Sequence, residues 1–344
     1  MKKLSLNLKN DTYDIIIEDD ILNHLSFYIK EVYKNKKIYI ITDDNVADIY
    51  LKLVLKNLKA DFEVDYVIIK NGEESKNIQV YSQIVEQLLN KNIRRNELLL
   101  ALGGGVVGDL TGFVAATLFR GLPYIGIPTS LLSQMDSSIG GKTGIDFSDR
   151  KNILGCFKQP LRVLIDPLAL NTLSKKEFNN GMGELIKHAC IGNKNLFTLL
   201  KQTKKIDEEI IYQSLLVKKH FVEIDEFDLK ERMILNFGHT FGHIIELENN
   251  LKHGEAVSLG IVMALKLGID LKISQESDLI QIIELLKLYD LPCYEIDYKP
   301  YLLKTLEDKK NLAGTINFIL LEELEKPIIY PLNENKLKEI LLWM

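Results

Sequence analysis

Residues 97–109 read ELLLALGGGVVGD, and this stretch decides the fold of the first half of the chain. Its apolar start has the length of a strand, and a helix-like run that ends at Leu118 follows the glycines. Gly103, Gly105 and Gly108 fit the pattern G-x-G-x-x-G in the strand–turn–helix context that this pattern requires. Such glycines bring backbone N–H groups and a helix N-terminus against a diphosphate. We therefore expect a dinucleotide-binding turn here, and a turn needed only for close packing is the alternative.

Similar strand-like runs occur on both sides of this stretch. They are rich in Ile, Val and Leu, and they cover residues 13–17, 37–42, 66–70, 124–128 and 162–166. Stretches with a helical period lie between them, for example residues 77–89. Strands that alternate with helices predict a parallel or mixed sheet with helices on both faces. We expect a Rossmann-like α/β dinucleotide-binding domain over residues 1–170.

The second half of the chain has a different pattern. Residues 174–290 show helical periodicity and few strand-like runs. Two short runs near the end, 316–321 and 328–330, are expected to form a small strand pair. We expect a mainly α-helical domain over residues 171–344.

Composition limits the class of protein. The chain has 344 residues, which suggests about two domains, and its net charge of −5 disfavours a duplex-binding protein. Its three cysteines are far apart and form no C-x-x-C pair, so neither a disulfide framework nor a thiolate zinc site is indicated. The N-terminus alternates where a signal peptide needs an apolar core, and no run approaches the roughly 18 apolar residues of a membrane span. We expect a soluble cytoplasmic protein that binds neither nucleic acid nor membrane.

Two further polar stretches belong to the first half. The run Asp43-Asp44-Asn45 follows a strand and is the candidate source of the carboxylate that contacts a ribose, with capping of the next helix as the alternative. Residues 136–146 contain Gly-Lys-Thr but lack the first glycine of a P-loop, which excludes an NTPase of that kind. We expect a small loop there that exposes its backbone, with Lys142 suited to an anionic ligand.

Histidine is concentrated in the second half, where five of the six lie from His188 to His253. His239 and His243 share one face if their segment is helical, and His253 follows His239 by fourteen residues. With Glu184 upstream, one Glu and two or three His form the ligand set of a catalytic Zn²⁺ or a similar ion. Spacing alone favours His239 and His243 as joint ligands and leaves His188 and His253 competing for the third position. Solvated or capping histidines are the alternative.

Several cations accompany these motifs. They are Lys142, Lys151, Lys187, Lys218, Arg232, Lys309 and Lys310. Lysines usually mark solvated surface, but Arg232 lies four residues before Asn236 and shares a helix face with it. Lys187 lies three residues after Glu184 and likewise shares a helix face with it. A substrate that bears a phosphate and a carboxylate suits such a set.

Taken together, these motifs resemble those of the 3-dehydroquinate synthases, a family of the sugar-phosphate cyclase group that is related to the metal-dependent glycerol dehydrogenases. The matching segments run through nearly the whole chain: 42–46, 72–76, 103–113, 120–121, 127–130, 136–142, 151–152, 181–184, 235–243, 253–257 and 308–310. The departures are small. Ser130 stands where a second Thr is common, and the loop from His243 to His253 is several residues shorter than usual.

The resemblance implies a role for each matching position. It makes Glu184, His239 and His253 the ligands of one divalent metal ion, zinc or cobalt, and moves His243 to the substrate. The positions that it assigns to NAD are Asp43, Asn45, Glu73, Lys76, Gly105, Val106, Val107, Gly108, Asp109, Thr129, Ser130, Lys142 and Lys151. The positions that it assigns to the substrate are Asp136, Lys142, Asn152, Lys187, Lys218, Arg232, Asn236, His243 and one of Lys309 and Lys310, with Lys310 favoured. It also implies a homodimer, because Arg120 in such enzymes reaches the site of the neighbouring subunit.

The resemblance also implies a reaction, the conversion of 3-deoxy-D-arabino-heptulosonate 7-phosphate into 3-dehydroquinate and phosphate. The implied steps are a transient NAD-dependent oxidation, phosphate elimination, re-reduction and an intramolecular aldol closure. Because phosphate is eliminated, the resemblance implies a lyase, and it implies the shikimate pathway. Two related alternatives are a cyclase that acts on a sedoheptulose phosphate and a simple polyol dehydrogenase. A non-catalytic nucleotide-binding protein is an alternative of a different class.

Overall fold

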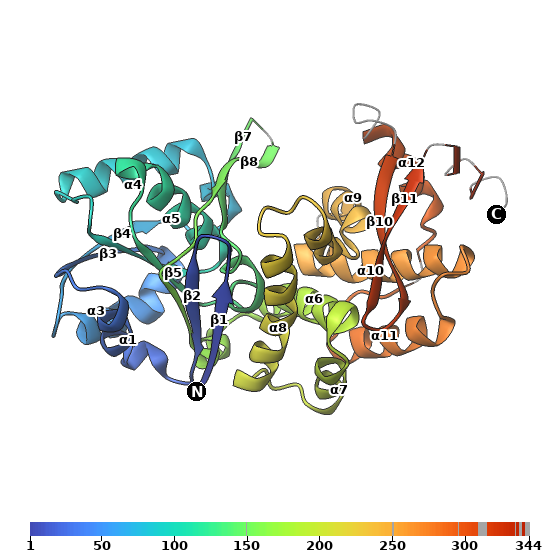
Figure 1. Ribbon diagram of the computed structural model, residues 1–344, viewed down its shortest axis with the longest axis horizontal. Helices are drawn as coiled ribbons and strands as arrows, with labels where there is room; N and C mark the ends of the chain where they lie inside the picture. The colour runs from blue at the N-terminus through green and yellow to red at the C-terminus, as the bar shows by residue number, and fades with distance from the viewer. Residues whose placement is uncertain are drawn as a thin grey trace. The chain divides into compact units, whose positions relative to one another are not determined.

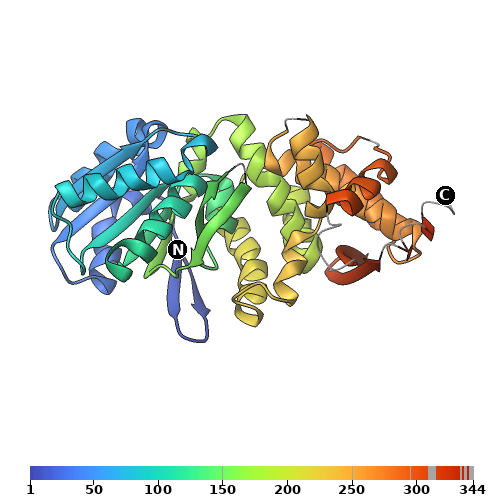
Figure 2. The same ribbon diagram turned by 90° about the horizontal axis from the view of Figure 1, so that it is seen from above.

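The computed structural model describes residues 1–148, 150–249, 251–294, 296–308, 315–333, 335–336 and 339–340. The chain divides into two compact units. The first comprises Met1–Ser174 with Ile206–Tyr212, and the second comprises Lys175–Lys205 with Gln213–Met344. In Figure 1 and Figure 2 the colour runs from blue at the start of the first unit to red at the end of the second.

The first unit is built on a seven-stranded sheet with the order β1-β2-β9-β6-β5-β3-β4. Its strands are β1 (Lys2–Asn7), β2 (Thr12–Ile17), β3 (Lys37–Asp43), β4 (Glu63–Ile69), β5 (Leu98–Gly103), β6 (Tyr124–Pro128) and β9 (Arg162–Ile165). β1 and β2 are antiparallel, and the other neighbouring pairs are parallel. The expected mixed sheet is therefore confirmed, and each predicted strand has its counterpart. The sequence pattern did not predict β1, which lies at the edge of the sheet.

Helices cover both faces of this sheet, because its central strands are apolar on both sides. The helices are α1 (Leu25–Val32), α2 (Asp44–Val46), α3 (Lys52–Leu58), α4 (Ile78–Asn90) and α5 (Gly105–Thr117). In β3, Ile38 and Ile40 join the core under α1 and α3, whereas Tyr39 and Ile41 join the core under α4 and α5. Successive residues of a strand point to opposite faces, so a strand buried on both sides has a continuous apolar sequence.

A hairpin and several short helical turns complete the first unit. The hairpin consists of β7 (Lys142–Phe147) and β8 (Arg150–Phe157), which pair antiparallel. The turns are η1 (Ile21–Asn23), η2 (Ala47–Leu51), η3 (Glu73–Ser75), η4 (Leu118–Arg120), η5 (Ser133–Ser137) and η6 (Pro167–Thr172). The expectation of a loop over residues 136–146 is wrong for residues 142–146, because these residues belong to β7, which pairs with β8.

The second unit is mainly helical, and α10 is its central element (Figure 1). Its helices are α6 (Lys175–Gly192), α7 (Lys194–Gln202), the part of α8 (Glu208–Ile224) that follows Tyr212, η7 (Glu231–Asn236), α9 (His239–Asn249), α10 (His253–Asp270), α11 (Glu276–Leu288) and α12 (Lys299–Asp308). Most of α10 is buried, and it packs against α6, α9, α11 and a strand. A helix that is apolar around its whole circumference belongs in an interior.

A strand pair follows these helices in the sequence. It is formed by β10 (Thr315–Glu323) and β11 (Lys326–Asn333), which confirms the small strand pair expected near the end of the chain. Over the described ranges, we find no helix with the length and apolar character that crossing a bilayer requires.

Candidate active site

The turn after β5 places glycine backbone at the carboxyl ends of two neighbouring strands. Gly104 precedes the first turn of α5, and the N–H of Thr129, just after β6, donates to the carbonyl of Gly103 at 3.0 Å. A Cβ at Gly103 would lie 2.6 Å from Val107 Cγ2, so this glycine serves close packing. A Cβ at Gly108 would meet no atom within 4 Å, so that side of the helix start is open. The turn thus has a packing role at Gly103 and an open side at Gly108.

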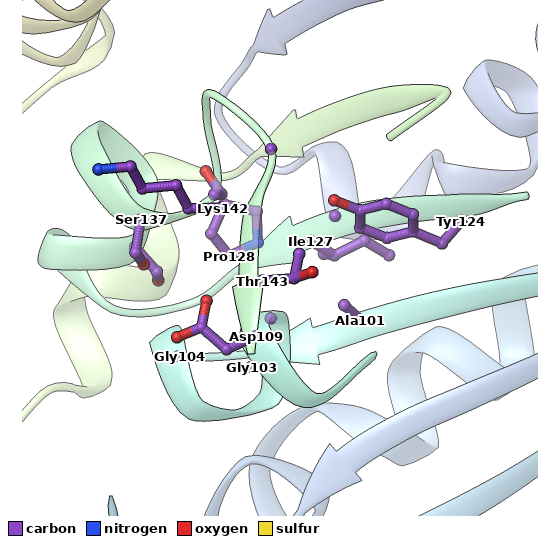
Figure 3. Close-up of a pocket in the computed structure, with 15 residues that line it drawn as sticks. Ala101, Gly103, Gly104, Asp109, Tyr124, Ile127, Pro128, Ser137, Lys142 and Thr143 are labelled. Atoms are coloured by element: carbon purple, nitrogen blue, oxygen red, sulfur yellow. The ribbon is translucent and has the colours of Figure 1, made fainter. Parts of the chain in front are cut away.

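Two pockets in the described part of the first unit lie near predicted site residues. The smaller one adjoins the glycine turn, and its lining includes Gly103, Gly104, Asp109, Tyr124 and Lys142 (Figure 3). Its cavity volume is about 20 Å³, room for roughly one water molecule. The larger one has a cavity volume of about 450 Å³, and its lining includes Glu73, Lys76, Asp146, Arg150 and Lys151. Sites for small molecules occupy about 300–1,000 Å³, so the larger pocket is the candidate for a nucleotide.

A buried ion pair connects α5 with the larger pocket. Lys76 Nζ lies 2.5 Å from Asp109 Oδ2 and 3.7 Å from Glu73 Oε1, and Lys76 is only 5% exposed. Burial raises the pKa of Asp109 to about 6, although Lys76 acts against this rise. Burial also opposes the charge of Lys76, but Asp109 and Glu73 outweigh it and raise the pKa of this lysine. Because two carboxylates face this one ammonium group, the ion pair fixes the lining of the pocket and adds no net positive charge to it.

The carboxylate expected to contact a ribose has a capping role. Asp43 Oδ1 accepts a hydrogen bond from the N–H of Val46 at 2.9 Å, which caps α2. Burial raises the pKa of Asp43, although the N–H groups of Val46 and Asn45 act against this rise. The Asn45 side chain belongs to an exposed residue. The capping interpretation is therefore confirmed, and a ribose contact stays a prediction for the same side chain.

The other residues predicted in this unit lie on β8, β7 and short turns. The hairpin contributes three exposed residues, Lys142, Lys151 and Asn152. Asn152 has a left-handed φ of 56°, and its N–H donates to Asp146 Oδ1 at 2.7 Å. Ser130 follows β6, Asp136 lies in η5, and the exposed Arg120 ends η4.

Three side chains of the second unit converge on one point. Glu184 of α6 is fully buried, and its Oε1 lies 3.2 Å from His239 Nε2 and 3.1 Å from His253 Nε2. The three ligand atoms all lie within 4.8 Å of one another. A carboxylate and two imidazoles at such distances fit a catalytic Zn²⁺ or a similar ion that keeps an open position. Within the described part of the chain, this is the one group of that kind.

The protonation states of Glu184 and His239 suit a metal, whereas His253 would first lose a proton. Burial opposes the charge of His253, but the carboxylates of Glu184 and Glu246 outweigh burial and raise the pKa of His253 to about 9, so a metal would displace a proton from that ring. Lys187, one turn along α6, forms an ion pair with the second oxygen of Glu184. Burial alone would raise the pKa of Glu184, but the charge of Lys187 and the proximity of His239 hold it well below its usual range. Burial lowers the pKa of His239, although Glu184 acts against this shift. A carboxylate and a neutral imidazole are the forms in which these residues bind metals.

Two histidines that spacing also allowed as ligands lie outside this cluster. His188 is buried and bonds through Nδ1 to a serine hydroxyl at 2.8 Å. His243 is exposed, and its ring centroid lies 5.3 Å from that of His239. The geometry therefore favours the set implied by the resemblance over joint ligation by His239 and His243.

Close packing of two helices explains why the cluster forms. A Cβ at Gly183 of α6 would lie 2.1 Å from the carbonyl oxygen of Gly254 of α10. A Cβ at Gly254 would lie 2.0 Å from the carbonyl oxygen of Asn180. The Asn180 side chain also accepts the N–H of Gly254 at 2.8 Å, in the first turn of α10. Because the glycines let the backbones touch, their neighbours Glu184 and His253 come together.

Buried cations and a polar turn occupy the same unit. The cations are Lys187, Lys218 and Arg232, which are 2%, 8% and 2% exposed. The N–H of Arg232 donates to Asp225 Oδ2 at 3.2 Å, and its Nη1 donates to a backbone carbonyl at 2.6 Å. Asn236 is exposed at the end of η7, and the predicted Lys309 and Lys310 lie outside the described residues. Ammonium and guanidinium groups bind carboxylates and phosphates well, so this unit suits an anionic ligand.

Sequence reasoning missed two side chains that support these sites. Asp146 contributes to the lining of the larger pocket and holds the backbone of Asn152. It belongs to the polar run over residues 136–146, so its carboxylate was a visible signal. Asn180 caps α10 from another helix, and no local pattern reveals a cap that comes from 74 positions away.

Solved structures share this fold. A crystal structure of 2-deoxy-scyllo-inosose synthase, complexed with carbaglucose-6-phosphate, NAD⁺ and Co²⁺, has a TM-score of 0.86 at 22% identity. The match covers 98% of this chain and 99% of that one. ValA (2-epi-5-epi-valiolone synthase) from Streptomyces hygroscopicus subsp. jinggangensis 5008, with NAD⁺ and Zn²⁺ bound, has a TM-score of 0.85 at 24% identity, with 98% of each chain covered. At these identities the two structures establish the fold alone.

Sequence comparison establishes the family. The family model for 3-dehydroquinate synthase N-terminal matches residues 66–180, and that for 3-dehydroquinate synthase C-terminal matches residues 181–311. The 3-dehydroquinate synthase of Clostridium perfringens (strain SM101 / Type A) is 44% identical over 342 residues, which cover 96% of this chain and 98% of that protein. This chain therefore belongs to the 3-dehydroquinate synthase family.

Proposed function

We propose that this chain is a lyase that converts 3-deoxy-D-arabino-heptulosonate 7-phosphate into 3-dehydroquinate and inorganic phosphate. The observation that carries the proposal is the convergence of Glu184, His239 and His253 on one point. Membership of the family supplies the substrate, and the buried cations of the second unit suit its carboxylate and phosphate. NAD and one Zn²⁺ or Co²⁺ are the proposed cofactors.

Two groups of residues would hold these cofactors. Glu184, His239 and His253 would bind the metal ion. The NAD side comprises Asp43, Asn45, Glu73, Lys76, Gly105, Val106, Val107, Gly108, Asp109, Thr129, Ser130, Lys142 and Lys151. When bound, the metal acidifies the hydroxyl that is oxidised, and NAD takes up a hydride and later returns it. Because the cofactor ends unchanged, the net reaction is an elimination and ring closure.

The remaining residues bind the substrate and stabilise its charge. Arg232 has the planar guanidinium that pairs best with a carboxylate. Lys187 is held beside Glu184, so its ammonium is fixed before a substrate arrives. The phosphate of the substrate is the proposed base for its own elimination, and positioning it is the proposed task of Lys142, Asn152, Lys187 and His243. No side chain then needs to act as the sole general base.

We also propose a homodimer in the cytoplasm. The basis for the dimer is Arg120, an exposed residue with a left-handed φ of 63° at the end of η4, which would reach the site of a second copy. The basis for the compartment is the thiol content, since Cys156, Cys190 and Cys293 are all free. Free thiols persist in a reducing environment.

Phosphate release tests the proposed reaction. The purified protein is supplied with NAD, Zn²⁺ or Co²⁺, and either the heptulosonate phosphate or a sedoheptulose phosphate. We expect rapid phosphate release from the heptulosonate alone, loss of release after chelation, and recovery after the metal is restored. Equal turnover of the neutral sugar phosphate would contradict the substrate assignment.

The same assay distinguishes the proposed enzyme from a polyol dehydrogenase and from a non-catalytic protein. A polyol dehydrogenase would accumulate NADH in amounts equal to the product, whereas the proposed cycle leaves the absorbance of NADH at 340 nm flat. NAD binding without any metal uptake would favour a non-catalytic nucleotide-binding protein.

A further inference from the structure

A second carboxylate contacts His253 at the ring nitrogen that does not face Glu184. Glu246 of α9 is 17% exposed, and its Oε2 lies 3.0 Å from Nδ1 of His253. Nε2 of the same ring lies 3.1 Å from Oε1 of Glu184. The imidazole of His253 is therefore held at both nitrogens by carboxylates from two different helices, α9 and α6.

The position of Glu246 follows from helical spacing. On α9, His239, His243 and Glu246 occupy positions i, i+4 and i+7, which lie on one face of the helix. His253 begins α10 and points back toward this face, as the two contacts of its ring require. α9 thus contributes both the proposed ligand His239 and the carboxylate that contacts the other proposed histidine ligand, His253.

The other histidine of the cluster is arranged in the same way. Nδ1 of His239 lies 3.3 Å from the carbonyl oxygen of Phe237, while its Nε2 faces Glu184. In both rings, an acceptor oxygen contacts Nδ1 and leaves Nε2 directed at the point where the ligand atoms meet. A histidine binds a metal through the nitrogen that bears no proton, and an acceptor at the other nitrogen selects that tautomer.

We propose that Glu246 is a positioning residue that holds His253 with Nε2 toward the metal and increases the affinity of the cluster for a divalent ion. The inference rests on the proposed role of His253 as a metal ligand. Glu246 itself contributes no atom to the converging group. Its effect is on the tautomer, the ring orientation and the basicity of His253.

The test measures metal affinity directly. Zn²⁺ affinity of the full-length protein is determined by competition with a chromophoric chelator for Glu246→Ala, Glu246→Gln and Glu248→Gln. Glu248 is the matched control, because it lies on the same helix and forms an exposed ion pair with Lys304. We expect Glu246→Ala to lower the affinity about 10–100-fold. Glu246→Gln keeps an acceptor oxygen and should lose less, and Glu248→Gln should match the wild type.

Two further measurements separate positioning from a structural role. The visible spectrum of the Co²⁺-loaded protein should change in Glu246→Ala, because the ligand geometry changes. Thermal unfolding of the metal-free protein should change little. An unaltered Zn²⁺ affinity and Co²⁺ spectrum in Glu246→Ala would overturn the proposal, as would a loss that simply follows a lowered melting temperature of the metal-free form.

Zn²⁺ binding by the wild type and by His253→Ala distinguishes a failure of the proposed metal site from a failure of the positioning role of Glu246. If the wild type binds Zn²⁺ and His253→Ala does not, the metal site stands and the Glu246 variants decide the positioning role. If the wild type takes up no divalent ion at all, the proposed metal site fails and the role of Glu246 fails with it.

Discussion

Gly183 of α6 lies so close to Gly254 of α10 that a Cβ on the former would come within 2.1 Å of the carbonyl oxygen of the latter. The obstacle is backbone, which cannot rotate away as a side chain can. The next residue in one helix is Glu184, and the preceding residue in the other is His253. This glycine contact therefore sets the separation of two proposed metal ligands.

Gly183→Ala should damage both stability and metal binding. The added methyl group forces α6 and α10 apart, and we expect a loss of about 2–3 kcal/mol or more of unfolding free energy. Denaturant unfolding and bound zinc per chain are the measurements. Gly192→Ala on the same helix is the control, since its Cβ would meet a valine methyl group at 3.0 Å, which can adjust. Normal zinc content in a stable Gly183→Ala protein would contradict the packing argument.

His253→Ala should remove the metal and leave the fold intact. The side chain is partly exposed and supplies one of the three converging atoms, so its loss leaves too few ligands. Zinc content and phosphate release should both collapse, while the circular dichroism spectrum stays that of the wild type. His220→Ala is the control, because His220 is exposed on α8. Undiminished metal content in His253→Ala would remove this residue from the ligand set.

Lys76→Met should destabilise the first unit because it leaves Asp109, whose side chain is only 20% exposed, without its cation. Breaking a buried pair from one side costs about 3 kcal/mol. NAD affinity should fall as well, which equilibrium dialysis would show. Lys70→Met is the matched control, since Lys70 is 79% exposed and its ion pair with Asp44 is solvated. Equal behaviour of the two variants would mean that the buried pair has no special role.

The stability deficit of Lys76→Met should grow with pH. The pKa of an Asp in an unfolded chain is about 3.9, whereas burial raises the pKa of Asp109 to about 6 in the folded protein. A raised folded pKa favours the protonated form, so the contribution of Asp109 to stability is lost as pH rises through that interval. Without Lys76 the folded pKa rises further and the loss continues above pH 6. Urea unfolding at pH 5.5 and pH 8 should therefore show the larger deficit at pH 8.

Mixing two inactive variants should restore activity if Arg120 acts in the neighbouring subunit. In a dimer of Arg120→Ala with His253→Ala, the Arg120→Ala chain keeps its own His253 and receives Arg120 from its partner. Random pairing then yields about a quarter of the wild-type number of complete sites. Co-expression with two affinity tags and the phosphate assay measure this recovery. No recovery in purified mixed dimers would place Arg120 in its own subunit's site or in none.

Local sequence was sufficient for much of the fold. The strands of the first unit are apolar on both faces, so residues such as Ile38 to Ile41 form continuous apolar runs, and the glycines after β5 mark the strand–turn–helix. The sequence predicts a loop where the strand pair β7–β8 begins, because glycines and polar residues hide its pairing. The capping role of Asp43 was visible but not separable from a ribose contact, since both need a carboxylate at the same place.

The residue types of the metal cluster can be read from the sequence, but which of these residues come together depends on the tertiary structure. The sequence by itself determined which residue types are present: a glutamate, five clustered histidines and the glycines beside them. Spacing favoured His239 with His243, because a spacing of four residues predicts proximity only for two residues of the same helix. The choice of His253 depends on α6, α9 and α10 meeting, and the glycine contact between Gly183 and Gly254 permits this approach. Residues that are far apart in the sequence can come together when helices pack, and sequence spacing does not show which of them do. The packing of separate helices therefore decides which side chains converge on the proposed metal site.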